Sequence, residues 1–408
     1  MPNHVEQSDT GRTQAGIAFQ PGRRPAPCYR LLLLNAAPGA TGATVRSGLR
    51  SIIELLGCLR AGDVPELAGQ PDKGAKASAD LFRGLEHLVG FGRRLFDTDV
   101  RAQPLVQVPR PDYLSYLPVD GPFPALRWES GFVRNRGEAD FALQLTSDSP
   151  AGVNCAAVEV WKLIQSQRMP FAAIASFDGF SRLDGRGWLE FHDGVSNMHS
   201  SERRNALEAP ADPAWMAGGT YMAFFRLIVD LATWRETPRD QQELVIGRDK
   251  LSGAALLGTE RDESGVLRPV SAQTLDDAPT DRELSDFRDP PQTTDPILEA
   301  SHVHRANQTR ASSLAPAGLR IFRQGYEFLD DIDEQPRLGL NFVSFQRDLA
   351  IVHQLLHLPG WLGDANFGGR VDDVDAPSLQ LCTMTAGGFY AIPPRGDDFP
   401  AAEIFARG

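Results

Sequence analysis

The stretch "GGTYMAFFRLIVDLATW" (residues 218–234) decides the fold of this chain. It begins with a near-continuous apolar run from Tyr221 to Val229, which is typical of a buried β-strand. This run is far shorter than the roughly 18 apolar residues that a membrane-spanning helix needs, and no other run in the sequence approaches that length. The stretch therefore predicts a strand inside a globular protein that has no membrane partner.

Similar strand-like pieces recur on both sides of this stretch, and helical patterns lie between them. The strand-like pieces are "LLLL" (31–34), "DFALQLT" (140–146), "LNFVSF" (340–345) and "GGFYAIPP" (387–394). Apolar residues spaced by three and four predict three helices, with faces Val45, Leu49, Ile52, Leu56 and Leu59; Val153, Ala157, Val160, Trp161 and Ile164; and Leu349, Val352 and Leu356. In "DFALQLT" the apolar residues alternate, so we expect one buried face. The arrangement predicts an α+β fold with antiparallel sheets and two similar halves.

Length and charge narrow the possible partners. The chain has 408 residues, 42% of them hydrophobic, and a net charge of −12 at pH 7. A chain of this length suits two domains or one large domain. A surface with this negative charge repels nucleic acid and anionic membranes, so neither is an expected partner.

Cysteine usage and the N-terminal region indicate the compartment. The four cysteines are scattered and form no CxxC pair, which argues against a zinc ribbon or a disulfide framework and fits a reducing compartment. Arg23 and Arg24 precede an apolar run of four residues, which is too short for the core of an export signal. We therefore expect a cytoplasmic protein.

The composition also suggests where the domains begin and end. Residues 1–26 are polar and rich in Gly, Pro and Gln, so we expect a disordered arm. An N-terminal domain is expected over 27–187 and a C-terminal domain over 188–400. Residues 259–300 contain eleven acidic and four basic residues with several prolines, which predicts a long loop inside the second domain.

One candidate for chemistry is "LEFHDGVSN" (residues 189–197). Its "GWLEFHDG" portion predicts a strand that runs into a turn at Asp193 and Gly194, which would present a carboxylate at a cleft. The alternative is that Asp193 only forms the turn, since Asp-Gly is a common turn pair. His192 and His199 flank it, but their spacing matches no strong metal-ligand pattern, and both also suit a polar surface.

A second candidate is "ASHVHRANQTR" (residues 300–310). If the stretch is extended, His302 and His304 lie on one face of a strand. A single imidazole can hold haem iron as an axial ligand, although both histidines would also suit a surface or a packed interior. Further on, "LRIFRQGYEF" (319–328) places Arg320 and Arg323 among apolar residues, where a guanidinium needs an anion or another polar ligand.

Other common chemistries lack sequence support. The chain contains no strand-linked GxGxxG or GxxxxGK[ST] nucleotide motif, no HExxH and no GxSxG elbow, and the acidic segment lacks EF-hand spacing. Residue patterns by themselves therefore leave an α+β protein in which a histidine-ligated metal or haem is one of the open alternatives.

The order of the motifs resembles that of the dye-decolourising peroxidase family (DyP-type haem peroxidases), from about residue 29 to residue 395. The segments that carry the resemblance are "HLVGFGRRLFD" (87–97), "FALQLTSDSP" (141–150), "FHDGVSN" (191–197), the block from Gly218 to Leu256 with "IGRDKLSG", "SHVHRAN" (301–307), "RIFRQG" (320–325) and "GGFYAIPP". Each motif is weak when taken singly, whereas their shared order is specific.

The resemblance implies a fold, a cofactor and a set of roles. It implies two ferredoxin-like halves of the dimeric α+β barrel type, with peripheral helices and haem b (iron protoporphyrin IX) held mainly by the C-terminal half. His302 falls on the iron ligand, Asp193 on the distal aspartate and Arg323 on the distal arginine. Asp348, in "FQRDL", falls near the acidic residue that accepts the second N–H of the ligand histidine.

The resemblance also implies the activity and the partners. The protein is expected to reduce hydrogen peroxide and to oxidise dye-like or phenolic molecules, as small aromatic reductants, through an oxoferryl intermediate. It is also expected to form a homo-oligomer. The alternative is a haem-binding or haem-handling protein, or a haem enzyme of secondary metabolism, that has little peroxidase turnover.

The sequence departs from the family pattern at one position. The family writes its catalytic turn as GxxDG, and Glu190 stands here in place of the first glycine. A glycine at that position allows close approach of the backbone or unusual φ and ψ angles. Glu190 could narrow the distal side of the site, add a second carboxylate there, or point outward.

Overall fold

The computed structural model describes most of the chain. The described residues are 12–17, 25–69, 71–97, 104–117, 128–129, 136–192, 198, 203, 206–271, 293–306, 321–331, 336–356, 381–396 and 398–405. Asp193 and His199, which the sequence marks as site candidates, lie outside them, as does Arg320.

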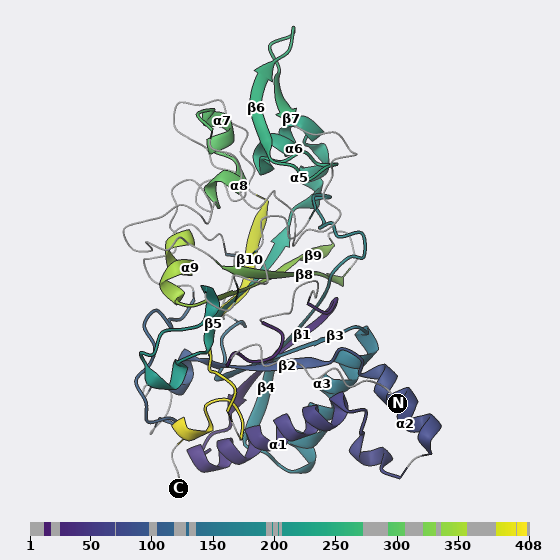
Figure 1. The fold of residues 1–408 in the computed structure, drawn as a ribbon, viewed down its shortest axis with the longest axis vertical. Coiled ribbons are helices and arrows are strands. Elements are labelled where there is room, and N and C mark those ends of the chain that lie inside the picture. Colours follow the sequence, from purple (N-terminus) through teal and green to yellow (C-terminus); the bar gives the residue numbers. More distant parts are fainter. Residues whose placement is uncertain are drawn as a thin grey trace.

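Eight strands form a closed barrel (Figure 1). In chain order they are β1 (Cys28–Ala36), β2 (Glu86–Gly92), β3 (Phe141–Ser147), β4 (Phe171–Phe180), β5 (Thr220–Val229), β8 (Phe322–Asp331), β9 (Arg337–Gln346) and β10 (Cys382–Ile392). Around the barrel the order is β1-β3-β2-β10-β5-β9-β8-β4, and neighbouring strands run antiparallel. Closure of the sheet leaves no open edge for other chains to pair with.

The barrel consists of two sets of four strands that share one topology. The first set runs β4-β1-β3-β2 and the second runs β10-β5-β9-β8, so each places its strands in the order fourth, first, third, second. This is the order of a ferredoxin-like half. The sets meet where β2 pairs with β10 and where β4 pairs with β8. The predicted α+β fold with two ferredoxin-like halves is therefore confirmed.

Helices cover the outer face of the barrel. In the N-terminal half these are α1 (Gly42–Arg60) and α3 (Pro150–Ser166), with α2 (Asp72–Leu81) beside α1, and α9 (Leu349–Leu356) lies against the C-terminal half (Figure 1). Thr41 caps α1 and Ser149 caps α3 by accepting backbone N–H bonds of the first turn. The predicted helices are confirmed, but Trp161 was wrongly placed on the buried face of α3, since its side chain is 55% exposed.

Side chains also fill the inside of the barrel. Tyr29, Leu31 and Leu33 of β1 point inward and pack against Phe224 of β5 and Phe345 of β9. Because the outer face of the sheet packs against helices, β3 is buried on both faces over its whole length. The expectation of one buried face for β3 was therefore wrong: alternation in its sequence reflects small and polar inward residues, not contact with water.

The predicted disordered arm is wrong for residues 12–17, which pack against the seam between the two halves. The Gln14 amide donates to the carbonyls of Val89 (3.0 Å) and Pro393 (2.9 Å) and accepts from the Val89 N–H (2.8 Å). Gly16 accepts a bond from Gln324 of β8, and Ile17 is buried in the barrel interior. Strands β2 and β10 pair with each other over only a short stretch. The Gln14 amide connects their backbones there and supplies hydrogen bonds that further strand pairing would otherwise provide.

The predicted loop over 259–300 is also partly wrong. Strands β6 (Leu256–Arg261) and β7 (Leu267–Ser271) form a separate hairpin, which projects at the end of the molecule away from α1 (Figure 1). The remaining helices are α5 (Leu231–Glu236), α6 (Arg239–Ile246), α7 (Pro296–Glu299) and α8 (His302–Arg305), and short 3₁₀ turns cover Pro65–Leu67, Arg93–Leu95, Ala214–Met216 and Ala402–Ile404.

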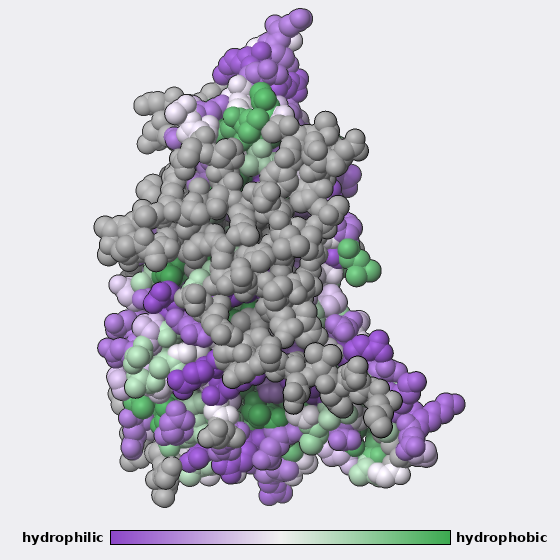
Figure 2. All heavy atoms as spheres, in the orientation of Figure 1, coloured by the Kyte–Doolittle hydropathy of each residue, from purple (hydrophilic) through white to green (hydrophobic). Residues whose placement is uncertain are grey.

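The surface shows where the polar residues gather. On the face seen in Figure 2, hydrophilic side chains cluster at the tip of the β6–β7 hairpin and over the helices at the opposite end. None of the helices in the described part of the chain has both the length and the apolar character that crossing a membrane requires.

Candidate functional site

Arg323 lies on the outer face of the C-terminal half of the barrel. Arg323 belongs to β8, where it pairs with Ser344 of β9. Two residues further along β8, Gly325 pairs with Phe342 of β9. Residues two apart on a strand point to the same face, so Arg323 shares a face with Phe342. Phe342 in turn pairs and stacks with Phe225 of β5, with ring centroids 6.0 Å apart. The Arg323 side chain therefore leaves β8 on the same face as this aromatic pair.

His302 is the first residue of the short helix α8, and this corrects the expectation of an extended segment. In a helix, residues two apart point in nearly opposite directions, so His302 and His304 do not share a face. His304 is buried, and its Nδ1 lies 2.9 Å from the Ser301 hydroxyl, which also donates to the Leu298 carbonyl. His304 thus anchors α8, and His302 is the histidine of the pair that could bind a ligand.

The surroundings of His302 keep its imidazole neutral. Burial, with smaller contributions from the positive charges of Arg323 and Arg248, lowers the pKa of His302 to about 3. The side chain keeps part of its surface accessible, but its surroundings exclude enough water to disfavour the charged form. A neutral imidazole offers a nitrogen lone pair to a metal at ordinary pH.

Gly247 fixes the position of α8 relative to α6. It ends α6 in the left-handed conformation, with φ of +85°, which glycine adopts without strain. A Cβ at this position would lie 2.3 Å from Ser301 Oγ and 2.7 Å from Val303 Cγ2, on either side of His302. The backbone of α8 can approach α6 this closely only because residue 247 has no side chain.

The turn that precedes Asp193 is a tight hairpin, not the strand predicted for "GWLEFHDG". Glu190 donates its N–H to the Gly187 carbonyl (2.7 Å), Gly187 donates to Phe191 (3.1 Å), and Arg186 bridges to His192. This pattern matches a three-residue hairpin loop whose third residue is left-handed. Glu190 indeed has φ of +65°. The position therefore favours glycine for its backbone conformation, and here a glutamate occupies it.

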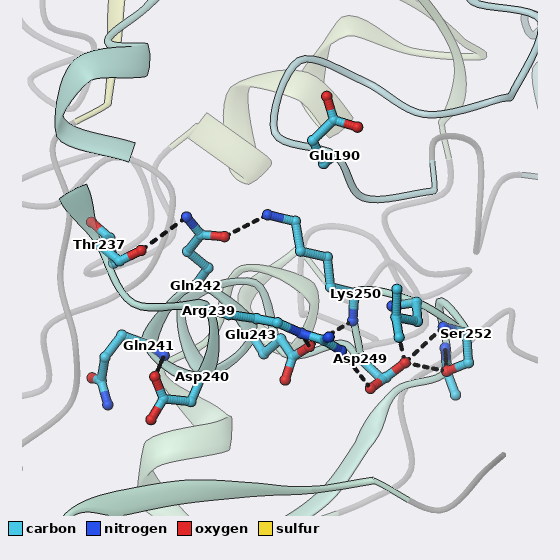
Figure 3. Close-up of polar contacts among 12 residues, drawn as sticks. Glu190, Thr237, Arg239, Asp240, Gln241, Gln242, Glu243, Asp249, Lys250 and Ser252 are labelled. Atoms are coloured by element: carbon cyan, nitrogen blue, oxygen red, sulfur yellow. Dashed lines mark hydrogen bonds and ion pairs between the residues drawn. The ribbon is translucent and has the colours of Figure 1, made fainter. Parts of the chain in front are cut away.

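The Glu190 side chain points outward, which settles the alternatives raised by the sequence. Its carboxylate pairs with Arg182 at 3.0 Å, and the side chain is 52% exposed. In Figure 3 the carboxylate points away from Lys250 and from α6. Glu190 therefore adds no second carboxylate beside the site, and the substitution changes the backbone preference of the turn instead.

Asp348 does not take the role expected of it. It is exposed at the start of α9, where its carboxylate accepts the Ala350 N–H at 2.8 Å. A carboxylate at hydrogen-bond distance would raise the pKa of an imidazole, whereas the pKa of His302 is lowered by burial and by two arginines. The structure therefore gives Asp348 a helix-capping contact and does not support its pairing with His302.

Arg248 is the residue that sequence reasoning missed. It follows Gly247 in "IGRDKLSG", a motif that we quoted for its order without assigning any role to its arginine. The side chain is buried, donates to the Gly253 carbonyl at 3.0 Å, and acts on the pKa of His302. Its neighbours in the sequence are Gly247 and Asp249, so no local apolar pattern marks its burial, and only the folded structure shows it.

A polar network holds the turn after α6 in place (Figure 3). Glu243 accepts from Arg239 (2.8 Å) and from the Lys250 N–H (3.0 Å), so α6 and the turn share one carboxylate. The carboxylate of Asp249 accepts the backbone N–H groups of residues 251 and 252 and the Ser252 hydroxyl. The Lys250 ammonium donates to Gln242 at 2.5 Å. This turn is therefore rigid before any ligand arrives.

Comparison with known proteins assigns the family. The model of the family "Dyp-type peroxidase, C-terminal" matches residues 184–397, which is more than half of the 408-residue chain. The chain belongs to the Dyp-type peroxidase family. It is accordingly a haem peroxidase, an enzyme whose family uses hydrogen peroxide and organic reductants.

Individual members of the Dyp-type peroxidase family show the same relationship. A dye-decolorizing peroxidase from Thermobifida fusca (strain YX) is 29% identical over 370 residues, which cover 83% of this chain and 75% of that protein. A deferrochelatase from Escherichia coli (strain K12) is 30% identical over 169 residues, or 40% of this chain and 34% of that protein. Ferric DtpA from Streptomyces lividans shares the fold, with a TM-score of 0.65, 21% identity, and coverage of 96% and 97% of the two chains.

The residues present fit the haem of a Dyp-type peroxidase. Haem needs an axial donor, cations for its carboxylates and a flat apolar surface. His302 supplies a neutral imidazole, and two guanidiniums, those of Arg248 and Arg323, lie close enough to influence it. The stacked rings of Phe225 and Phe342 supply an apolar surface on the face of Arg323. Donor, cations and surface converge from separate segments of the C-terminal half.

The contact between Gly247 and α8 makes a testable prediction. Gly247→Ala should weaken haem binding at least about tenfold, because the added Cβ strains the left-handed backbone and displaces Ser301 and Val303 around His302. Titration of the haem-free protein with haem measures the loss. Gly57→Ala in α1 is the matched control, since its Cβ would meet no atom within 4 Å. Equal affinities of the two variants would contradict the proposed constraint.

The outward position of Glu190 makes a second prediction. Glu190→Gly should leave haem content and peroxidase rate within about twofold of the starting protein, because an exposed ion pair contributes little. Glu190→Val should lower the free energy of unfolding by about 1–2 kcal/mol, since a β-branched residue is strained at positive φ. Denaturant unfolding and steady-state turnover measure the two effects. A large change in the pH profile of Glu190→Gly would show that the carboxylate acts inside the site.

Proposed function

We propose that His302 is the axial ligand of the haem iron and that Asp193 and Arg323 act on hydrogen peroxide at the opposite face. The observation that supports this most strongly is the contact between Gly247, beside Arg248, and the residues on either side of His302. The positive charges of Arg323 and Arg248, from two other segments, also lower the pKa of the His302 imidazole. Asp193 lies outside the described residues, so its role is carried over from the family motif "FHDG".

On the proximal side, the protein presents His302 as a ready ligand. Its imidazole is neutral at working pH, and α8 is held in position by Ser301 and by the contact with Gly247. A ligand held in place before binding loses little conformational freedom when it meets the metal. When bound, haem supplies the redox centre that passes electrons to hydrogen peroxide and regains them from the reductant.

On the distal side, the proposed roles follow from charge. The carboxylate of Asp193 would take a proton from hydrogen peroxide and return it to the leaving oxygen. Arg323, whose guanidinium stays charged at all working pH values, would stabilise the negative charge that develops on the peroxide as its O–O bond breaks. The stacked rings of Phe225 and Phe342 give the same face an apolar surface, and a less polar surrounding would strengthen that interaction.

We propose dye-like or phenolic molecules as the organic reductants. The name of the Thermobifida fusca relative, a dye-decolorizing peroxidase, supports this class of substrate. Association of the chain into a homo-oligomer, which the family resemblance implies, stays a prediction.

A second function is favoured by the relatives named deferrochelatase. Their similarity covers 40% of this chain at 29–30% identity. Removal of iron from haem would be a form of the haem handling that the sequence left open. Release of metal-free porphyrin from haem, measured by its fluorescence, separates this activity from peroxide turnover.

The assignment of the iron ligand can be tested by exchanging the two histidines of α8. His302→Gln should abolish the Soret band of the purified protein, because the iron loses its imidazole. His304→Gln should retain the band, since that side chain bonds to Ser301. Absorption spectra of both variants at equal protein concentration make the comparison. The reverse result would assign the iron to His304.

The distal roles can be tested by the rate of the peroxide reaction. Asp193→Ala should slow this reaction by about 10²-fold or more, since it removes the proton carrier. Arg323→Leu should slow it by a similar factor through loss of charge stabilisation. Stopped-flow absorbance after mixing with hydrogen peroxide measures the rate, and the Soret band confirms that haem is still bound. Unchanged rates in both variants would remove Asp193 and Arg323 from the mechanism.

A further inference from the structure

Arg186 lies between the hairpin that precedes Asp193 and the turn that follows α6. The inference below rests on the proposed role of Asp193. Nη1 of Arg186 donates to the carbonyls of Glu190 and Lys250, both at 2.7 Å. Nη2 lies 3.1 Å from the Leu251 carbonyl and 3.1 Å from Nε2 of His192. The guanidinium therefore contacts two segments that are more than fifty residues apart.

The guanidinium of Arg186 donates to both segments. Its two terminal nitrogens carry four N–H groups, and the carbonyls of Glu190, Lys250 and Leu251 accept from them. Nε2 of His192 lies 3.1 Å from Nη2 and 3.2 Å from the Leu251 carbonyl, so His192 either accepts from Arg186 or donates to Leu251, according to its tautomer. One of the three carbonyls belongs to the hairpin and two belong to the turn after α6, so Arg186 bonds to both segments.

Each of the two segments is ordered by its own contacts. The hairpin is closed by the bonds between Gly187 and Phe191 and between Glu190 and Gly187. In the turn, Asp249 binds the N–H of Leu251, and Gly253 donates back to the Asp249 carbonyl. Arg186 therefore does not have to create order in either segment. It sets the position of one ordered segment relative to the other.

Packing supports the same connection. The ammonium of Lys250 lies 5.4 Å from the centre of the Phe191 ring and 5.6 Å from that of Trp234. Trp234 donates from its indole to the Leu189 carbonyl at 3.3 Å, and a Cβ on Gly253 would lie 3.1 Å from the His192 ring. These contacts place the hairpin against α5 and the turn, and the hydrogen bonds of Arg186 fix the position of the hairpin there.

We propose that Arg186 is a positioning residue for the peroxide reaction. It holds residues 190–192, which lead directly into Asp193, against the turn after α6. The same region of α6 packs through Gly247 on α8, which carries His302. Arg186 thereby relates the distal aspartate to the segment that positions the iron ligand, although it touches neither peroxide nor haem itself.

Arg182 provides a matched control on the same segment. Its guanidinium pairs with the side chains of Asp184 and Glu190, at the surface of the molecule. It also approaches the Gly187 carbonyl at 3.4 Å, within the same hairpin. Arg182 thus has the charge and location of Arg186, but it makes no contact with the turn after α6.

The experiment compares Arg186→Met, Arg186→Lys and Arg182→Met in the haem-loaded, full-length protein. Hydrogen exchange of the backbone amides over residues 187–192, followed by mass spectrometry, reports on the hairpin. Stopped-flow mixing with hydrogen peroxide reports on the distal step, and the KM for a phenolic reductant reports on the remaining turnover. Asp193→Ala is carried in parallel.

We expect Arg186→Met to accelerate exchange over 187–192 and to slow the peroxide reaction at least tenfold, with the reductant KM unchanged. Arg186→Lys should show the same pattern, since one ammonium cannot replace the two terminal nitrogens that reach the hairpin and the turn together, and it serves if the Met variant does not fold. Arg182→Met should match the starting protein in both measurements.

Unchanged exchange in the Arg186 variants would overturn the proposed connection, and faster exchange with an unchanged peroxide rate would overturn its positioning role. A wild-type rate for Asp193→Ala would instead contradict the proposed function, so the two failures are distinguishable.

Discussion

The close contact between the end of α6 and the start of α8 is the constraint on which the rest of the site depends. Gly247 lets the end of α6 lie directly against the side chains of Ser301 and Val303, which a Cβ at residue 247 would meet at 2.3 and 2.7 Å. The segment that begins at Gly247 continues into a turn whose carbonyls accept from Arg186, in the hairpin that precedes Asp193. Both faces of the proposed haem site therefore depend on the position of one short segment, and a shift of that segment would move both faces together.

The barrel explains why such a segment is needed. Its strands provide Arg323 and the aromatic surface on a rigid wall, but His302 and the distal hairpin both lie in connections between strands. Connections have fewer neighbours than strands and need dedicated contacts to hold a precise geometry. The α6 turn supplies these contacts through a buried carboxylate, Glu243, and through backbone bonds that water cannot easily replace.

Periodicity in the sequence predicts helices and strands well where the spacing of apolar residues alone decides which side chains are buried. It predicts them poorly where tertiary contacts compete with that spacing. Strand β5 and helix α1 follow directly from apolar runs and spacings, and the family resemblance supplies the pairing into a closed barrel. The placement of Trp161 fails because only tertiary packing shows which side of α3 meets the sheet. The helical form of residues 302–305 is set by contacts with α6 that no local pattern records. Asp348 shows the same limit, since its position in a motif did not reveal that it caps a helix.

The contacts of residues 12–17 have a consequence for how the chain assembles. One partner of Gln14, Pro393, lies 379 positions later in the chain, and the Arg395 N–H bonds to the Arg12 carbonyl. At a translation rate of about 5–20 residues per second, that partner leaves the ribosome roughly 20–80 s after Gln14. The seam between β2 and β10 can therefore be sealed only after Pro393 has been synthesised, so the N-terminal half and residues 12–17 remain without these contacts while the intervening residues are made.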